Sequence, residues 1–97
     1  MEVIAKKAIN EFIEKYPKSA KSMLDWYLKT KESHWTNFAD IKGVFGATDS
    51  VGNGLYVFNI GGNKYRLIAR IIFAARTVFI RFIGTHKDYD KVKLSDL

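Results

Sequence analysis

The stretch LYVFNIGGNKYRLIARIIFAARTVFIRFIG, residues 55–84, consists mainly of aliphatic, β-branched and aromatic residues and contains no proline. Such residues fit a pleated surface better than a helix. Gly61–Asn63 tolerates positive φ and separates two apolar runs, and Ala74–Arg76 separates the second run from a third. The stretch therefore predicts an antiparallel meander of three strands. These strands are expected at Leu55–Ile60, Lys64–Phe73 and Thr77–Gly84.

Two amphipathic helices are predicted before the strands, because apolar residues recur there at the spacing of one helix face. The first covers Lys6–Tyr16 and is ended by Pro17, which lacks an amide hydrogen and disfavours helical geometry in the residue before it. The second extends from Ala20 to near Glu32. A short strand at Glu2–Ile4 is expected before the first helix.

A short third helix is predicted next, with Thr36 as its cap and Gly43 as the left-handed residue that closes it. Phe38 and Ile41 are expected to point inward. The glycine- and asparagine-bearing region 43–54 is expected to be a loop.

These elements predict an α+β fold, with two N-terminal helices packed on a small antiparallel β-sheet as a two-layer sandwich. The 97 residues, of which 47% are hydrophobic, suffice for a single domain over residues 1–97. No apolar run reaches the length of a membrane span, and the first residues lack the pattern of a secretion signal. We therefore expect no membrane association.

The absence of cysteine excludes disulfides, thiolate metal sites and cysteine nucleophiles, and it suits a reducing compartment. The cytoplasm is the expected location. Two histidines without cysteine make a zinc site improbable. No metal and no cofactor are expected.

The positive charge is concentrated in the second half of the chain, since residues 51–97 hold eight basic and three acidic residues. No carboxylate occurs between Asp49 and Asp88, and all four arginines lie in that interval. Because the guanidinium fork matches phosphate oxygens, this distribution favours a polyanionic partner. The alternative is a solvated basic surface without a partner.

Strand alternation assigns two faces to the predicted sheet. On the middle strand, the core side receives Leu67, Ala69, Ile71 and Phe73, and the opposite side receives Arg66, Ile68, Arg70 and Ile72. On the last strand, Val78, Ile80 and Phe82 are expected to join the core, leaving Phe79, Arg81 and Ile83 beside those arginines. The arginines are expected to converge in one anion-binding cradle. Interleaved cations and aromatic rings suit single-stranded RNA, whereas an ordinary solvent face is the alternative.

The motif GTHKDYD, residues 84–90, holds the densest group of proton carriers in the chain. One turn of helix would bring His86 and Tyr89 onto one face, with Asp90 placed to orient the imidazole. Such a group can transfer protons. A histidine that only caps or covers the end of a strand is the alternative.

The run YVFNIGGNKYRLI, residues 56–68, followed by GTHKDYD, resembles the HigB-type toxins of bacterial toxin–antitoxin pairs, a branch of the RelE superfamily. Ala8, Tyr16 and Pro17 fit the opening of the same family, so the resemblance covers nearly the whole chain. It implies a RelE-like domain and an endoribonuclease that cleaves mRNA on the ribosome without a metal. The implied partner is a helix-turn-helix (HigA-type) antitoxin.

The implied chemistry is attack of the RNA 2′-hydroxyl on the adjacent phosphorus. By position in the motif, Arg66 resembles the strand arginine that holds the scissile phosphate, and His86 and Tyr89 occupy the positions used for acid–base catalysis. Asp90 is a supporting residue. Further phosphate contacts are expected from Lys64, Arg70, Arg81 and Lys87. The alternatives are a noncatalytic RNA-binding module that uses the same basic face, and a small protein-interaction domain.

Overall fold

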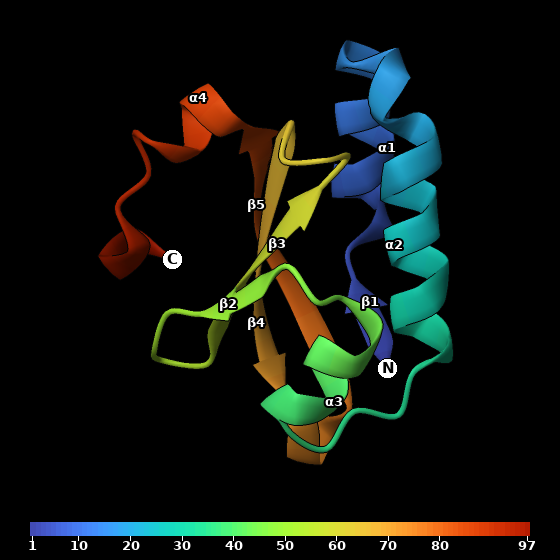
Figure 1. Cartoon of the computed structure of the whole chain (residues 1–97), viewed down its shortest axis with the longest axis vertical. Helices are drawn as coiled ribbons and strands as arrows, with labels where there is room; N and C mark the ends of the chain where they lie inside the picture. Colours follow the sequence, from blue (N-terminus) through green and yellow to red (C-terminus); the bar gives the residue numbers. More distant parts are fainter.

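The computed structural model describes residues 1–97 and orders the helices and strands along the chain as β1, α1, α2, α3, β2, β3, β4, β5 and α4 (Figure 1). Their bounds are β1 Glu2–Ile4, α1 Lys6–Lys15, α2 Ala20–Glu32, α3 Phe38–Val44, β2 Thr48–Ser50, β3 Leu55–Ile60, β4 Tyr65–Ile72, β5 Thr77–Thr85 and α4 His86–Tyr89. Single 3-10 turns cover 17–19, 73–75 and 94–96. The three predicted strands and the two predicted long helices are confirmed within one or two residues.

The sheet has five strands in the order β1-β5-β4-β3-β2. Strands β2 to β5 pair antiparallel, as predicted for the meander, but β1 pairs parallel with β5, so the sheet is mixed. Strand β2 lies inside the region expected to be a loop. Its three residues pair with Tyr56–Phe58 of β3, and a strand this short leaves too little alternation in the sequence to be recognised.

Helices α1 and α2 lie side by side on one face of the sheet (Figure 1). Ile9 and Phe12 of α1 and Met23 and Trp26 of α2 are buried there. The same cluster includes, from the sheet, Phe58, Leu67, Ala69, Ile71 and Val78. The two-layer α+β arrangement is therefore confirmed. No helix combines the length and the apolar character that crossing a lipid bilayer requires.

The predicted cap of the third helix is wrong by one residue. The Asn37 side chain accepts the amide hydrogen of Asp40, whereas the hydroxyl of Thr36 donates to the Asp40 carboxylate. Gly43 does not close the helix, because α3 continues to Val44. Asn37 is also a favourable capping residue, and residue type alone does not distinguish between adjacent candidates.

A β-bulge in β5 changes which side chains face the core. Ile68 is paired with Phe82 and Ala69 with Ile80, so Arg81 has no partner on β4. The extra residue reverses the alternation beyond it. Ile83 consequently packs against the core, and Phe82 packs on the opposite face with Ile68. The prediction that Phe82 is inward and Ile83 outward is therefore wrong.

The second face of the sheet is partly covered by the chain that follows β5. Leu55, Val57 and Ile68 form a small buried cluster on this face. Phe82 and four residues of the last segment pack against this cluster, namely Tyr89, Val92, Leu94 and Leu97. Figure 1 shows this segment on the side of the sheet away from α1 and α2. The expected basic face is thus open only outside this cover.

Candidate functional site

Helix α4 is fixed at the end of β5 by contacts at its first residues. The Thr85 hydroxyl accepts the amide hydrogen of Asp88 at 3.2 Å, and the Asp88 carboxylate accepts that of Thr85 at 3.2 Å. This reciprocal pair is a capping box. The amide of His86 donates to the carbonyl of Lys64 at 3.2 Å. The single predicted turn of helix at His86–Tyr89 is confirmed, and it is tied to Lys64, the residue before β4.

Asp88 is an anion with a defined role in this turn. Hydrogen bonds from the backbone amide and the side chain of Thr85 hold the pKa of the Asp88 carboxyl below its ordinary value of 3.8. The nearby positive charges of Lys15 and Lys91 lower this pKa as well. The carboxylate is therefore ionised at neutral pH.

His86 and Asp90 lie one helical turn apart, with His86 Nδ1 3.5 Å from Asp90 Oδ2. Both side chains are more than half exposed. An acceptor beside Nδ1 favours the tautomer in which Nδ1 carries the proton, so Nε2 is free to face a ligand. Asp90 is placed as the sequence predicted for a residue that orients the imidazole.

Arg66 is the least exposed charged side chain of the site, at 9%. Its Nη1 donates to the carbonyls of Asn63 at 3.0 Å and Tyr65 at 3.3 Å, and its Cζ lies 5.7 Å from the centre of the Tyr89 ring. None of the three ion pairs in the structure includes it. Arg66 therefore holds a cation in a largely desolvated position, with donors left over and no carboxylate to neutralise it.

Lys64 and Lys87 are exposed and belong to the two segments that meet next to this arginine. Lys64 directly precedes β4 and accepts the His86 amide with its carbonyl, and Lys87 is the second residue of α4. The structure thus brings together five of the residues singled out in the sequence: Lys64, Arg66, His86, Lys87 and Tyr89, with Asp90 beside His86.

The other two arginines that were predicted to bind phosphate lie elsewhere. Arg70 donates to the backbone oxygen of Asn53 and, at 2.9 Å, to that of Leu97. Its side chain therefore connects the loop before β3 to the last segment. Arg70 is four residues from Arg66 along β4, a separation of about 13 Å. Arg81 is the bulged residue and lines a groove beside α1. The expectation that the arginines converge in one cradle is wrong, because the bulge and the tail redirect two of them.

Two residues near the site were missed by the sequence analysis. Lys15, at the end of α1, is close enough to Asp88 to lower its pKa. Asp88 lies within the motif GTHKDYD, but no role was predicted for it. Neither had a signal in the sequence beyond its type, because their proximity depends on how α1 packs against β5. No group of three or more His, Cys, Asp or Glu side chains is arranged to hold a metal ion.

Residues 19–92 match the HigB toxin family, described as the RelE-like toxic component of a toxin–antitoxin system. This chain belongs to that family. HigB proteins of Escherichia coli and Shigella flexneri are similar to this chain over most of its length. The "mRNA interferase toxin HigB" of Escherichia coli is 32% identical over 92 residues, which are 93% of this chain and 88% of the relative. The "mRNA interferase HigB" of Shigella flexneri gives the same values. A second Escherichia coli strain has an "mRNA interferase HigB" that is 32% identical over 94 residues, 95% of this chain and 91% of the relative.

Both motifs that carried the resemblance to HigB toxins lie in the part that the family match covers. YVFNIGGNKYRLI forms β3, the β3–β4 turn and the start of β4, and GTHKDYD forms the end of β5 and α4. The amide of His86 bonded to Lys64 joins the two motifs directly. In this HigB toxin, the two sequence signatures therefore lie side by side.

Proposed function

We propose that this HigB toxin is an endoribonuclease that cleaves mRNA on the ribosome and thereby stops translation and growth. Its relatives carry the name mRNA interferase, and the same chemistry suits the residues gathered at α4. The observation that carries the proposal is Arg66, a largely buried guanidinium with free donors and no carboxylate partner. Buried cations without a counterion are costly, so a position of this kind fits an anion that arrives with the substrate.

The reaction begins when the RNA 2′-hydroxyl loses its proton and its oxygen attacks the adjacent phosphorus. The bond to the 5′-oxygen then breaks, and that oxygen takes up a proton, giving a 2′,3′-cyclic phosphate and a 5′-hydroxyl. Arg66 holds the phosphate and stabilises the charge that grows on its oxygens. His86 and Tyr89 perform the two proton transfers, and Asp90 orients His86.

Phosphates flanking the cleaved bond contact the exposed cations around this centre. Lys64 and Lys87 are exposed on the two segments that adjoin Arg66 and are suited to this role. Arg81 serves as a more distant phosphate contact on the α1 side. Arg70 uses at least two donors on the protein itself, so its contact with RNA involves the remaining ones.

The ribosome supplies what the site lacks. The His86 and Asp90 side chains are more than half exposed, so little of the protein fixes the substrate against them. Presenting the mRNA in one conformation would supply much of the required orientation. As a toxin of a toxin–antitoxin system, the protein requires an antitoxin, which we propose is a helix-turn-helix protein acting with it in the cytoplasm.

The experiment compares the wild type with His86→Ala in a reconstituted translation mixture, with and without ribosomes, by mapping the ends of the mRNA. We expect cleavage by the wild type only with ribosomes, fragments with 5′-hydroxyl ends, and a loss of about two orders of magnitude or more in His86→Ala. Equal cleavage by the variant would remove His86 from the mechanism.

The control for folding is thermal unfolding of both proteins, since His86 is exposed and its removal should cost little stability. If the folded wild type binds RNA but never cleaves it, the noncatalytic RNA-binding module is the better description.

A further inference from the structure

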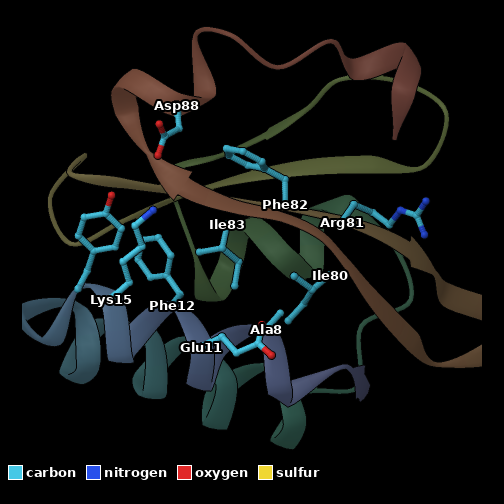
Figure 2. Close-up of a pocket in the computed structure, with 10 residues that line it drawn as sticks. Ala8, Glu11, Phe12, Lys15, Ile80, Arg81, Phe82, Ile83 and Asp88 are labelled. Carbon is cyan, nitrogen blue, oxygen red and sulfur yellow. The ribbon is translucent and has the colours of Figure 1, made fainter.

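A groove of about 360 Å³ lies along the outer edge of β5, between that strand and α1. Strand β1 pairs only with Thr77–Phe79, so β5 has no outer neighbour from Ile80 onward. Figure 2 shows Ile80 and Ile83 on the α1 side of β5, and Phe82 and Asp88 on its other side. The groove therefore passes around a strand edge, and it ends beside α4, which carries the candidate catalytic residues.

Opposite charges approach one end of this groove without meeting. Lys15 extends from α1 toward Asp88 (Figure 2), and it belongs to none of the ion pairs in the structure. Asp88 keeps its charge because it accepts the amide hydrogen of Thr85. A bound molecule could thus contact a cation and an anion within the same space. An inorganic anion alone would leave the Asp88 carboxylate unfavourably close to it.

Aromatic rings line the same passage. Phe82 lies on the Asp88 side of the strand, and its ring covers Gly84, where an added Cβ would come within 2.5 Å of the ring. On the α1 side, the rings of Phe12 and Tyr16 are 4.8 Å apart. A flat heterocycle can stack on such rings whatever its identity.

We propose that this groove binds one nucleotide of the RNA strand that is cleaved at α4, with its base on Phe82, its base donors facing Asp88 and its phosphate on Lys15. This inference rests on the proposed function for the identity of the RNA. A nucleotide combines a flat ring, exocyclic or ring N–H donors and an anionic phosphate, and the groove offers a complement to each. Asp88 and His86 belong to the same helix, α4, so a nucleotide in the groove lies within one helical turn of the candidate catalytic residues.

The same edge is poorly suited to an added β-strand of a partner protein. The bulge at Arg81 interrupts the regular row of backbone groups, and the amide of Thr85 is already bonded to Asp88. The groove is also open to solvent and not enclosed, which fits a strand that passes through it better than a small metabolite. A segment of single-stranded RNA is therefore the occupant that the geometry favours.

The test measures binding of a short 2′-methoxy RNA, which lacks the attacking hydroxyl and cannot be cleaved. Lys15→Gln should weaken binding about three- to tenfold and lower the salt dependence by about one phosphate contact. Phe82→Leu keeps an apolar side chain but removes the ring, and it should weaken binding at least about fivefold. The matched control is Lys21→Gln on α2, which removes the same charge outside the groove and should have a smaller effect. Thermal unfolding shows whether each variant is folded.

Crosslinking gives a second readout that needs no substitution. The same RNA carrying a photoreactive 5-iodouridine at successive positions should give, at one position, a crosslink to Phe82 or Tyr16. Two results overturn the proposal: crosslinks confined to β4 and the tail, or Lys15→Gln and Phe82→Leu proteins that bind as the wild type does. Competition by a mononucleotide as strong as by the RNA would reassign the groove to free nucleotides.

The failure of this inference and the failure of the proposed function are distinguishable. If the groove variants lose affinity but the wild type cleaves no mRNA, the RNA subsite stands and the enzymatic proposal is wrong. If the wild type cleaves mRNA and the groove variants keep full affinity, the enzyme stands and the groove is not part of its substrate site.

Discussion

Replacing Arg66 by methionine should abolish most cleavage while leaving the fold nearly intact. The substitution removes a buried cation and keeps an unbranched side chain of similar length. It loses two backbone contacts, to Asn63 and Tyr65, and the stacking of the guanidinium on Tyr89. A methionine still packs on that ring, because its sulfur makes favourable contacts with aromatic edges.

The two effects differ in magnitude. Each lost hydrogen bond contributes about 1 kcal/mol and the cation–ring contact about 0.5 to 2 kcal/mol. Removing a charge that is only 9% exposed and has no counterion offsets part of this loss. We therefore expect the free energy of unfolding to fall by no more than about 2 kcal/mol. Losing a preorganised donor to the developing charge, in contrast, should slow cleavage by about 10² to 10³-fold.

The assay follows the cleavage rate of an mRNA in a reconstituted translation mixture and measures stability by urea unfolding of the same preparation. Arg76→Met is the matched control, because Arg76 is exposed in the β4–β5 turn and should leave the rate unchanged. The reasoning is refuted if Arg66→Met cleaves within a few-fold of the wild type. It is also refuted if stability falls by more than about 4 kcal/mol, since Arg66 would then be required by the fold.

Three further outcomes are expected. Gly84→Ala should destabilise the protein by about 1 to 3 kcal/mol in urea unfolding, because the added Cβ meets the Phe82 ring at 2.5 Å; an unchanged midpoint would show that the ring moves aside freely. Arg70→Met should free the last segment, seen as faster hydrogen exchange of its amides, with a global loss of about 1 to 2 kcal/mol; unchanged exchange would mean that apolar packing alone holds the segment. The folded-state pKa of Asp88 lies below its ordinary value of 3.8, so the capping of α4 should persist above that pH and be lost only as the pH falls below it. The NMR shift of the Asp88 amide measures the capping, and loosening of α4 at pH 5 would contradict the prediction.

The long, strongly patterned elements could be predicted from sequence, and the parts set by tertiary contacts could not. Helices α1 and α2 and strands β3, β4 and β5 follow the periodicity of their apolar residues. Strand β2 is only three residues long, and the bulge at Arg81 leaves no mark in the alternation, since Phe82 and Ile83 are both apolar. For this reason, the sequence prediction placed Phe82 and Ile83 on the wrong faces of the sheet.

The candidate site divides in the same way. The local part of the motif, from His86 to Asp90, forms one helical turn as its spacing predicted. The neighbourhood of Arg66 depends on pairing between distant segments, and the different surroundings of Arg70 depend on where the tail lies. Lys15 reaches the site from α1, a proximity that no spacing in the sequence encodes.

The bulged residue of β5, Arg81, determines which side of the sheet each later residue of the strand faces. If Arg81 paired with Ile68 in a regular ladder and did not bulge, the residues after it would exchange sides of the sheet. Gly84 would then no longer face the same side as Arg66, and α4 would leave the strand toward the long helices. Loss of the bulge alone would in this way separate the imidazole from the guanidinium, although every side chain of the site would still be present.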